Sequence, residues 1–336
     1  MKNEVVTIGD SLKDIFVFPA EKEMERPISE EEIRRPVHGE KFLLFEFGDK
    51  ITISHIHYDI GGSACNVAVG LAKLGVKAAI ISSVGADSEG EQIIERLHDK
   101  KVNTEMIHQV KGKNTSFSIV ISYKGERSIL VFRSFVAADF SIPEQLDTDW
   151  IYASPLGEGY KTLYSKLTSL AIEKNIKIAL NPGDVQIHDG LMAFGGILRV
   201  AKVLFLNREE AAKLAGFRGV ATVKDVSLSL LKTGVETVVI TDGRDGAYAA
   251  RGEEFIKIGA YPGNRFEVTG AGDSFASAFL SAYIRDEKLF ECLKWGVTNS
   301  ASVIEKTGAQ DGLLSSNVIK KRINEYRWPA SSMRFS

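Results

Sequence analysis

The chain has 336 residues, of which 44% are apolar, and its formal net charge at pH 7 is −2. This length can bury the core of one large domain or of two smaller ones. The near-neutral charge argues against nucleic acid or an anionic membrane as the partner, and no apolar segment is long enough to span a bilayer. The two widely spaced cysteines, Cys65 and Cys292, and a start without the pattern of a signal peptide lead us to expect a cytoplasmic protein with free thiols.

The N-terminal part of the chain mixes several kinds of element. Val5–Ile8 predicts a buried strand, and the polar, Pro-containing residues 19–41 predict a surface insertion. Two hairpins are expected, each from two alternating segments around a Gly-containing turn: residues 42–47 with 51–58, and 115–123 with 127–132. Such antiparallel pairs would form a small separate sheet, which we expect to act as a lid. Between the hairpins, two helices and a strand are predicted: residues 64–74, 92–100 and 78–81.

From about residue 149 the pattern becomes a regular alternation of helices and short apolar strands. The predicted strands are residues 150–152, 176–180, 203–206 and 237–240. Such strands, separated by helices, indicate a parallel sheet covered on both faces, and these sheets bind ligands beyond the carboxyl ends of their strands. The polar residues that follow the strands are therefore candidates for one shared site: Asp10, Asp14, Asn181, Asn207 and Thr241.

The segment from Glu267 to Phe275 carries the strongest chemical signal. Gly270 and Gly272 can adopt backbone angles closed to other residues, so consecutive N–H groups can point at one spot. The helix predicted to follow adds the positive end of its dipole there. Asp273 lies beside this anion cradle, where a carboxylate base could help a hydroxyl attack a terminal phosphoryl group. A glycine-rich helix start capped by Asp is the alternative interpretation.

Three further motifs allow both a structural and a functional interpretation. Asn207 and Glu210 have nearly the spacing of a capping box, and they could also hold Mg²⁺ through water, because Mg²⁺ keeps most of its hydration. Thr241–Ala247 is either an ordinary loop or a backbone platform for nucleotide phosphates. Gly61–Asn66 is either a tight turn before a helix or a place where a ligand approaches the backbone, with Asn66 offering a donor and an acceptor to hydroxyls.

In their order along the chain, these motifs resemble those of the ribokinase/PfkB carbohydrate kinase family, from about residue 4 to residue 325. One family pattern fits Gly61–Ala68, and a second fits Thr269–Leu280 around Gly-Ala-Gly-Asp. The family's Asn-x-x-Glu element is met by Asn207 and Glu210. The P-loop, the full dinucleotide fingerprint and the Gly-x-Ser-x-Gly elbow are missing from the sequence, which disfavours other nucleotide-binding and hydrolase classes.

The resemblance implies a role for each matching position. Asp273 would be the catalytic base, and the backbone of Gly270, Ala271 and Gly272 would form the anion hole. The other implied contacts are with the sugar (Asp14, Gly62 and Asn66), with the nucleotide (Asn181, Asn207, Thr241, Gly243, Gly246 and Asn299) and, through water, with Mg²⁺ (Asn207 and Glu210). Many members bind K⁺ near the anion hole, but Glu267 replaces the Asp that serves there as a ligand, which argues against K⁺ activation.

The implied fold is α/β, with a doubly wound, mainly parallel sheet and a small β-sheet lid. Residues 1–326 would form the kinase domain, with lid segments at about 11–60 and 113–135, and residues 327–336 a loosely ordered C-terminal tail. Closure of the lid would expel water from the reacting groups. In many members of the family the lid also forms a homodimer interface.

The sequence therefore predicts an ATP- and Mg²⁺-dependent kinase for a small sugar of the ribose or fructose type. The alternatives are a nucleoside kinase of the same family and a non-catalytic module that senses sugars or nucleotides. Arg133 could meet an acidic substrate, but pairing with a lid carboxylate is the favoured interpretation. Four aromatic residues of the expected lid could stack on a nucleoside base: Phe42, Phe45, Phe47 and Tyr58.

Overall fold

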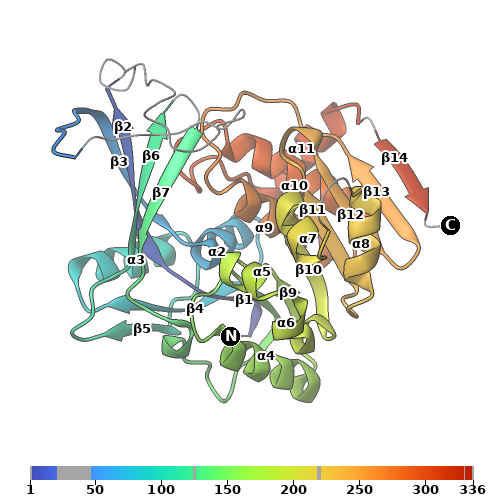
Figure 1. Ribbon diagram of the computed structural model, residues 1–336, viewed down its shortest axis with the longest axis horizontal. Helices are drawn as coiled ribbons and strands as arrows, with labels where there is room; N and C mark the ends of the chain where they lie inside the picture. Colours follow the sequence, from blue (N-terminus) through green and yellow to red (C-terminus); the bar gives the residue numbers. More distant parts are fainter. Residues whose placement is uncertain (1, 21–46, 124–125, 218–220, 329, 335–336) are drawn as a thin grey trace.

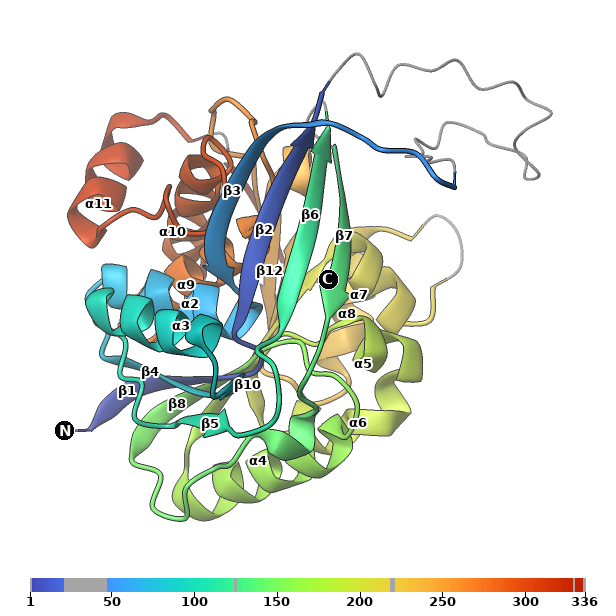
Figure 2. The same cartoon turned by 90° about the vertical axis from the view of Figure 1, so that its left-hand side faces the viewer.

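A computed structural model of the chain describes residues 2–20, 47–123, 126–217, 221–328 and 330–334. Within these ranges the strands form a ten-stranded sheet with helices on both faces and a four-stranded sheet that stands apart from it (Figures 1 and 2). This arrangement confirms the predicted doubly wound α/β fold with a small separate sheet.

The large sheet has the strand order β14-β13-β12-β11-β10-β9-β8-β1-β4-β5. Its strands are β1 (Asn3–Ile8), β4 (Ala78–Gly85), β5 (Ile107–Val110), β8 (Thr148–Ala153), β9 (Lys177–Leu180), β10 (Ala201–Asn207), β11 (Thr237–Thr241), β12 (Ala247–Arg251), β13 (Glu254–Ile258) and β14 (Ala330–Arg334). Neighbours from β5 to β11 pair in parallel, whereas β12, β13 and β14 pair antiparallel. Every residue of β4 is buried, as a strand covered on both faces requires.

Helices cover both faces of the large sheet. They are α2 (Ser63–Lys73), α3 (Ser88–Asp99), α4 (Tyr160–Lys174), α5 (Asp184–Asp189), α6 (Leu191–Leu198), α7 (Arg208–Leu214), α8 (Val223–Leu231), α9 (Ala271–Tyr283), α10 (Leu289–Val303) and α11 (Ser316–Glu325). Val6 of β1 belongs to the core that α4 to α8 cover, and its neighbour Val5 belongs to the core under α2, α9, α10 and α11. The two neighbours therefore point into cores on opposite faces of the sheet, as the alternation of side chains along a strand dictates. A third cluster joins α2 and α3 to β4.

The small sheet has the order β3-β2-β6-β7. Its strands are β2 (Leu12–Pro19), β3 (Ile53–Gly61), β6 (Phe117–Tyr123) and β7 (Glu126–Phe132). The antiparallel pairing of β6 with β7 confirms the second predicted hairpin, whereas β2 and β6 pair in parallel. These strands fall within the segments 11–60 and 113–135 that the sequence assigns to a lid.

The first strand of the first predicted hairpin lies almost entirely outside the described residues, as does most of the predicted insertion at 19–41, because residues 21–46 are not described. The second strand of that hairpin corresponds to β3, which pairs antiparallel with β2. The sequence did not reveal β2 because Asp14, which is only 6% exposed, interrupts the apolar side of its alternating pattern.

The C-terminal segment also differs from the expected loose tail. β14 pairs antiparallel with β13 and so extends the edge of the large sheet through main-chain hydrogen bonds. Its sequence, Ala-Ser-Ser-Met-Arg, lacks the apolar alternation by which a strand is recognised. Among the described residues, no helix is long and apolar enough to cross a membrane.

Candidate active site

One edge of the large sheet collects the polar residues that follow its strands. β1, β8, β9, β10 and β11 run in the same direction, so their carboxyl ends lie along the same edge. Asp10, Asn181, Asn207 and Thr241 follow or end four of these strands. The small sheet rises from this edge, as Figure 2 shows, so that both sheets border the same region.

The start of α9 has the backbone conformation that an anion cradle needs. Gly270 caps the helix with φ of 74°, in the left-handed region, and a Cβ there would lie 2.4 Å from that of Ala309. The amide of Ser274 makes an intrahelical bond of 2.8 Å to the Gly270 carbonyl. The Ala271 amide donates to Val268 over 3.3 Å. The first N–H groups of a helix have no acceptor within it. The N–H of Gly272 and the helix dipole therefore favour a negative ligand here.

Asp273 lies in the first turn of this helix. Its Oδ2 accepts a hydrogen bond of 2.9 Å from Nδ2 of Asn66, which projects from α2. Burial raises the pKa of the Asp273 carboxyl, and the side chains of Asn66 and Ser63 oppose that shift by hydrogen bonding to the ionised form. The structure thus places a carboxylate with a raised pKa in the same first turn as the initial amides of α9.

Asp14 is a second buried carboxylate on the same side of the site. Burial raises its pKa to about 6, against a hydrogen bond from the Ser118 hydroxyl, and the charges of Asp59 and Asp273 raise it further. A Cβ at Gly61 would lie 1.9 Å from Asp14 Oδ2, so the glycine makes room for this carboxylate.

Gly62 and Asn66 hold the start of α2 beside this carboxylate. Gly62 caps the helix with φ of 96°, and a Cβ there would lie 2.2 Å from the carbonyl oxygen of Asp10. Asn66 uses its amide within the protein, because its Oδ1 accepts a 2.9 Å hydrogen bond from Gln310 while its Nδ2 binds Asp273.

Arg133 pairs with Asp10. Its Nε lies 3.2 Å from Asp10 Oδ2, and about half of the Arg133 side chain is exposed. Pairing with a carboxylate was the favoured interpretation of this residue, although the partner follows β1 and does not belong to the lid.

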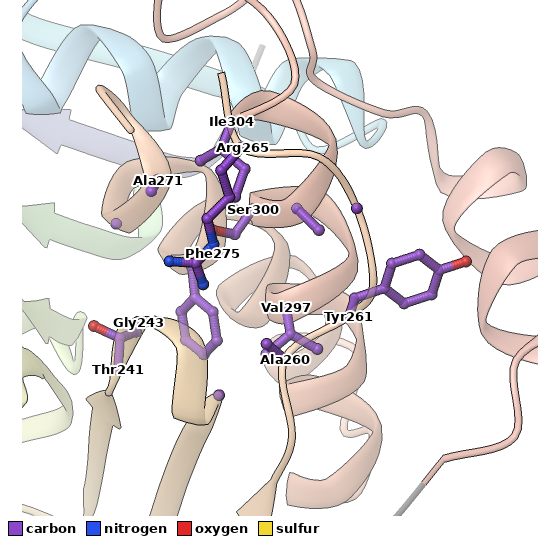
Figure 3. Close-up of a pocket in the computed structure, with 14 residues that line it drawn as sticks. Thr241, Gly243, Ala260, Tyr261, Arg265, Ala271, Phe275, Val297, Ser300 and Ile304 are labelled. Atoms are coloured by element: carbon purple, nitrogen blue, oxygen red, sulfur yellow. The ribbon is translucent and has the colours of Figure 1, made fainter. Parts of the chain in front are cut away.

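A pocket joins three of the predicted nucleotide residues to the start of α9 (Figure 3). Thr241, Gly243 and Gly246 line it together with Ala271 and Gly272. The wall also contains residues that the sequence does not point to, from the loop after β13 and from α10 with its C-cap: Ala260, Tyr261, Gly263, Arg265, Val297, Ser300, Ala301 and Ile304. No motif marked them, because a helix face and a loop are brought to the pocket only by tertiary packing.

Two predicted nucleotide residues have structural hydrogen bonds instead. Asn299 is fully buried, donates to the Ser274 carbonyl over 2.8 Å and accepts from the Leu314 amide over 3.0 Å. Its neighbour Ser300 lines the pocket, whereas Asn299 does not. Asn181 accepts from the Tyr152 hydroxyl and donates to the Phe205 carbonyl, which fixes its amide at the end of β9.

Asn207 and Glu210 form the complete capping box of α7. Asn207 Oδ1 accepts from the Glu210 amide, and Glu210 Oε2 accepts from the Asn207 amide, both over 2.8 Å. Burial raises the pKa of Glu210, and the negative charge of Asp184 adds to the shift. One oxygen of Glu210 is not used by the capping box and could face a hydrated Mg²⁺. Within the described residues there is no group of three or more His, Cys, Asp or Glu that could hold a metal directly.

Glu267 lies just before the anion cradle and is almost fully buried. Its Oε1 accepts from the amide and the hydroxyl of Thr269, over 2.8 and 2.6 Å. Nη1 of Arg127, from β7, is 3.9 Å from the same oxygen. Among the described residues, Oε2 has no hydrogen-bond partner. Glu267 therefore has the charge to attract a cation, and a guanidinium of the small sheet is already beside it.

Comparisons with known proteins identify the family of the chain. Residues 34–316 match the model of the pfkB family carbohydrate kinases. A 5-dehydro-2-deoxygluconokinase of Listeria monocytogenes serotype 4a is 30% identical over 290 residues, covering 79% of this chain and 86% of the relative. A ribokinase of Haemophilus influenzae is 27% identical over 274 residues, covering 79% and 88%.

The solved structures that resemble the chain show the fold. The ribokinase of Arabidopsis thaliana complexed with ribose and ATP has a TM-score of 0.78 at 20% identity, covering 97% of this chain and 100% of that one. A putative ribokinase II from E. coli in complex with ATP and Mg²⁺ has a TM-score of 0.76 at 19% identity, covering 96% and 100%. The fold is therefore ribokinase-like.

The chain belongs to the pfkB family of carbohydrate kinases. It is accordingly a sugar kinase, an enzyme that transfers a phosphoryl group to an alcohol group. The alternative of a non-catalytic sensing module is set aside, because the relatives that match over most of the chain are named as kinases.

The raised pKa of Asp14 predicts a pH-dependent effect of Asp14→Asn on stability. In the unfolded chain the carboxyl ionises at its ordinary, lower pKa, whereas in the folded protein it ionises only near pH 6. The folded state therefore binds more protons between these values, and stability falls as the pH rises through them. The full effect would be about 3 kcal/mol, and we expect less after relaxation of the site.

Asn cannot ionise, so the variant should gain stability over the wild type between about pH 4 and pH 6, with a constant difference above that range. Urea unfolding of both proteins across this range measures it. Glu173→Gln, at an exposed position of α4, is the control and should show no such trend. A difference between Asp14→Asn and wild type that does not change with pH would contradict the prediction.

Proposed function

We propose that the chain uses ATP and Mg²⁺ to phosphorylate a hydroxyl of a small sugar of the ribose or fructose type. Asp273 is the general base, and the backbone of Gly270–Gly272 is the anion hole. One observation carries the proposal: Asp273 lies in the first turn of α9, directly after Ala271 and Gly272, which line a pocket together with Thr241, Gly243 and Gly246.

In this mechanism, Asp273 accepts the proton of the substrate hydroxyl as its oxygen attacks the γ-phosphorus, and ADP leaves. The amides of α9 and its dipole stabilise the negative charge on the transferred group. The raised pKa of Asp273 makes its carboxylate a better proton acceptor than an exposed one. Bound Mg²⁺ would neutralise phosphate charge, and the side chains of Asn207 and Glu210 would hold it through water.

Other residues bind and orient the substrates. Asp14, Gly62 and Asn66 line the sugar side, where the Asp14 carboxylate can accept hydrogen bonds from hydroxyls. On the nucleotide side, Arg265 lines the pocket, and Figure 3 shows its side chain within it. Burial and the nearby charge of Arg244 lower the pKa of Arg265. Two like charges so close together favour an anionic ligand such as a nucleotide. The small sheet would close over both substrates and expel water.

Asp273→Asn should leave the fold intact and reduce kcat by about 10²- to 10⁴-fold, because the amide cannot accept the hydroxyl proton. ATP consumption with the best acceptor measures the effect. Asp147→Asn, at an exposed position before β8, is the matched control and should keep normal turnover. Near-normal turnover of Asp273→Asn would exclude this residue as the base.

A sugar acid is a second candidate for the acceptor. Half of the Arg133 side chain is exposed, and only its Nε is engaged with Asp10, so the rest of the guanidinium can bind a carboxylate. A relative with 30% identity is named for a gluconate derivative.

A nucleoside is the further alternative, because aromatic residues of the small sheet could stack on its base. Tyr58 is 49% exposed on β3, while Phe42 and Phe45 lie outside the described residues.

A panel of neutral sugars, sugar acids and nucleosides, assayed with ATP and Mg²⁺, separates these acceptors. We expect the highest kcat/KM for a ribose- or fructose-type sugar, unchanged in Arg133→Gln. If a sugar acid is the substrate, Arg133→Gln should raise KM for the acid alone, because a single charged hydrogen-bond donor is lost. Turnover of nucleosides alone would contradict both sugar candidates.

We further infer that Arg127 supplies the positive charge beside Glu267, in the place of K⁺. Its distance of 3.9 Å to the buried carboxylate supports this. Turnover should then be the same in sodium and in potassium buffers, and Arg127→Gln should make it potassium-dependent. A potassium requirement of the wild type would contradict the inference.

Two further expectations concern assembly and compartment. Apolar side chains exposed on the small sheet support a homodimer through the lid: Ile53, Ile56, Phe117, Ile129, Leu130, Val131 and Phe132. The molar mass in solution tests this expectation. The buried free thiols of Cys65 and Cys292 are compatible with the cytoplasm, which cell fractionation tests.

A further inference from the structure

A chain of hydrogen bonds connects the surface of the protein to Asp273. Lys100 Nζ donates to Gln310 Oε1, Gln310 Nε2 donates to Asn66 Oδ1, and Asn66 Nδ2 donates to Asp273 Oδ2, each over 2.9 Å. The four residues come from the end of α3, the segment before α11, α2 and α9. Tertiary packing alone brings them together, since 207 or more positions separate each bonded pair.

The two amides of this chain are buried. Gln310 is 4% exposed and Asn66 is 5% exposed. Gln310 Nε2 also donates to the Ile60 carbonyl over 3.0 Å. A buried amide turned the wrong way would face donor with donor or acceptor with acceptor, and would lose its partners without gaining water.

Two groups, one that can only donate and one that can only accept, fix the direction of this chain of hydrogen bonds. The Lys100 ammonium can only donate, so it must face the oxygen of Gln310, and the Ile60 carbonyl can only accept, so it must face the nitrogen. Gln310 therefore presents a donor to Asn66. Asn66 must therefore accept this hydrogen bond through its oxygen, and its nitrogen then donates to Asp273.

We propose that Gln310 is a positioning residue for phosphoryl transfer, which acts through Asn66 to keep an N–H donor aimed at the Asp273 carboxylate. The inference rests on the proposed role of Asp273 as the base. That donor stabilises the ionised carboxylate, the form that accepts a proton, and holds one of its oxygens so that the other is free for the substrate. Asp14 and Tyr152 also face Asp273, and Asp59 and Cys65 face Lys100.

Gln310→Glu tests the direction of the chain, because Glu has nearly the same shape and its carboxylate can only accept. Asn66 would then turn its nitrogen to residue 310 and its oxygen to Asp273. We expect kcat to fall about 10- to 100-fold, the equivalent of one charge-assisted hydrogen bond. The acidic limb of the kcat–pH profile should move to higher pH, since the base loses its donor. KM for ATP should not change.

Gln310→Met provides the variant without a buried charge. With neither donor nor acceptor at residue 310, Asn66 can keep its nitrogen towards Asp273, so the loss in kcat and the shift of the acidic limb should be smaller than for Gln310→Glu. Lys100→Met should have a smaller effect still, because the Ile60 carbonyl continues to orient Gln310. Gln145→Glu, at an exposed position, is the control and should behave as wild type. Thermal unfolding of all variants checks that they fold.

An acidic limb that stays in place in both Gln310 variants, with losses in kcat that follow their losses in Tm, would overturn the proposal and leave Gln310 a structural role only. Asp273→Asn separates this failure from failure of the proposed function. If that variant loses turnover while the Gln310 variants keep the wild-type pH profile, only the positioning role is wrong. If Asp273→Asn is active, the role of the base itself is wrong.

Discussion

Helix α9 can begin where it does because residue 270 has no side chain. Its φ of 74° lies in the left-handed region, and a Cβ would collide with Ala309. The same turn places Ala271 and Gly272 in the wall of the pocket and Asp273 in the first turn of the helix. A single backbone conformation thus places the helix amides and the Asp273 carboxylate in one turn, and the proposed nucleotide and sugar sides of the site are arranged around it.

Burial of carboxylates is the main electrostatic cost of this arrangement. Asp14 and Asp273 both have a raised pKa, chiefly because of burial, and each also has a side-chain donor that opposes the shift, Ser118 for Asp14 and Asn66 for Asp273. These donors are neutral, so they favour the ionised form without adding a cation that would compete for phosphate. In the proposed mechanism, these donors would keep the base charged when the small sheet closes over the site.

The sequence predicts the features that depend on local pattern. The parallel strands and the glycine-flanked start of α9 follow from periodicity and from backbone freedom, and both are present. Strand β2 was not predicted, because the buried Asp14 breaks its apolar alternation. Whether Asn299 or Ser300 faces the pocket depends on the rotation of α10, which packing decides. The bond between Asn66 and Gln310 spans 244 positions and has no local signal.

The central claim is that one carboxylate and one set of helix amides act on the same phosphoryl transfer. A crystal structure with the accepted sugar and a non-hydrolysable ATP analogue tests this claim most directly. The acceptor hydroxyl should lie within about 2.6–3.2 Å of an Asp273 oxygen, with the γ-phosphate at the amides of Ala271 and Gly272. A γ-phosphate bound away from the start of α9, or a hydroxyl held by another base, would contradict the account.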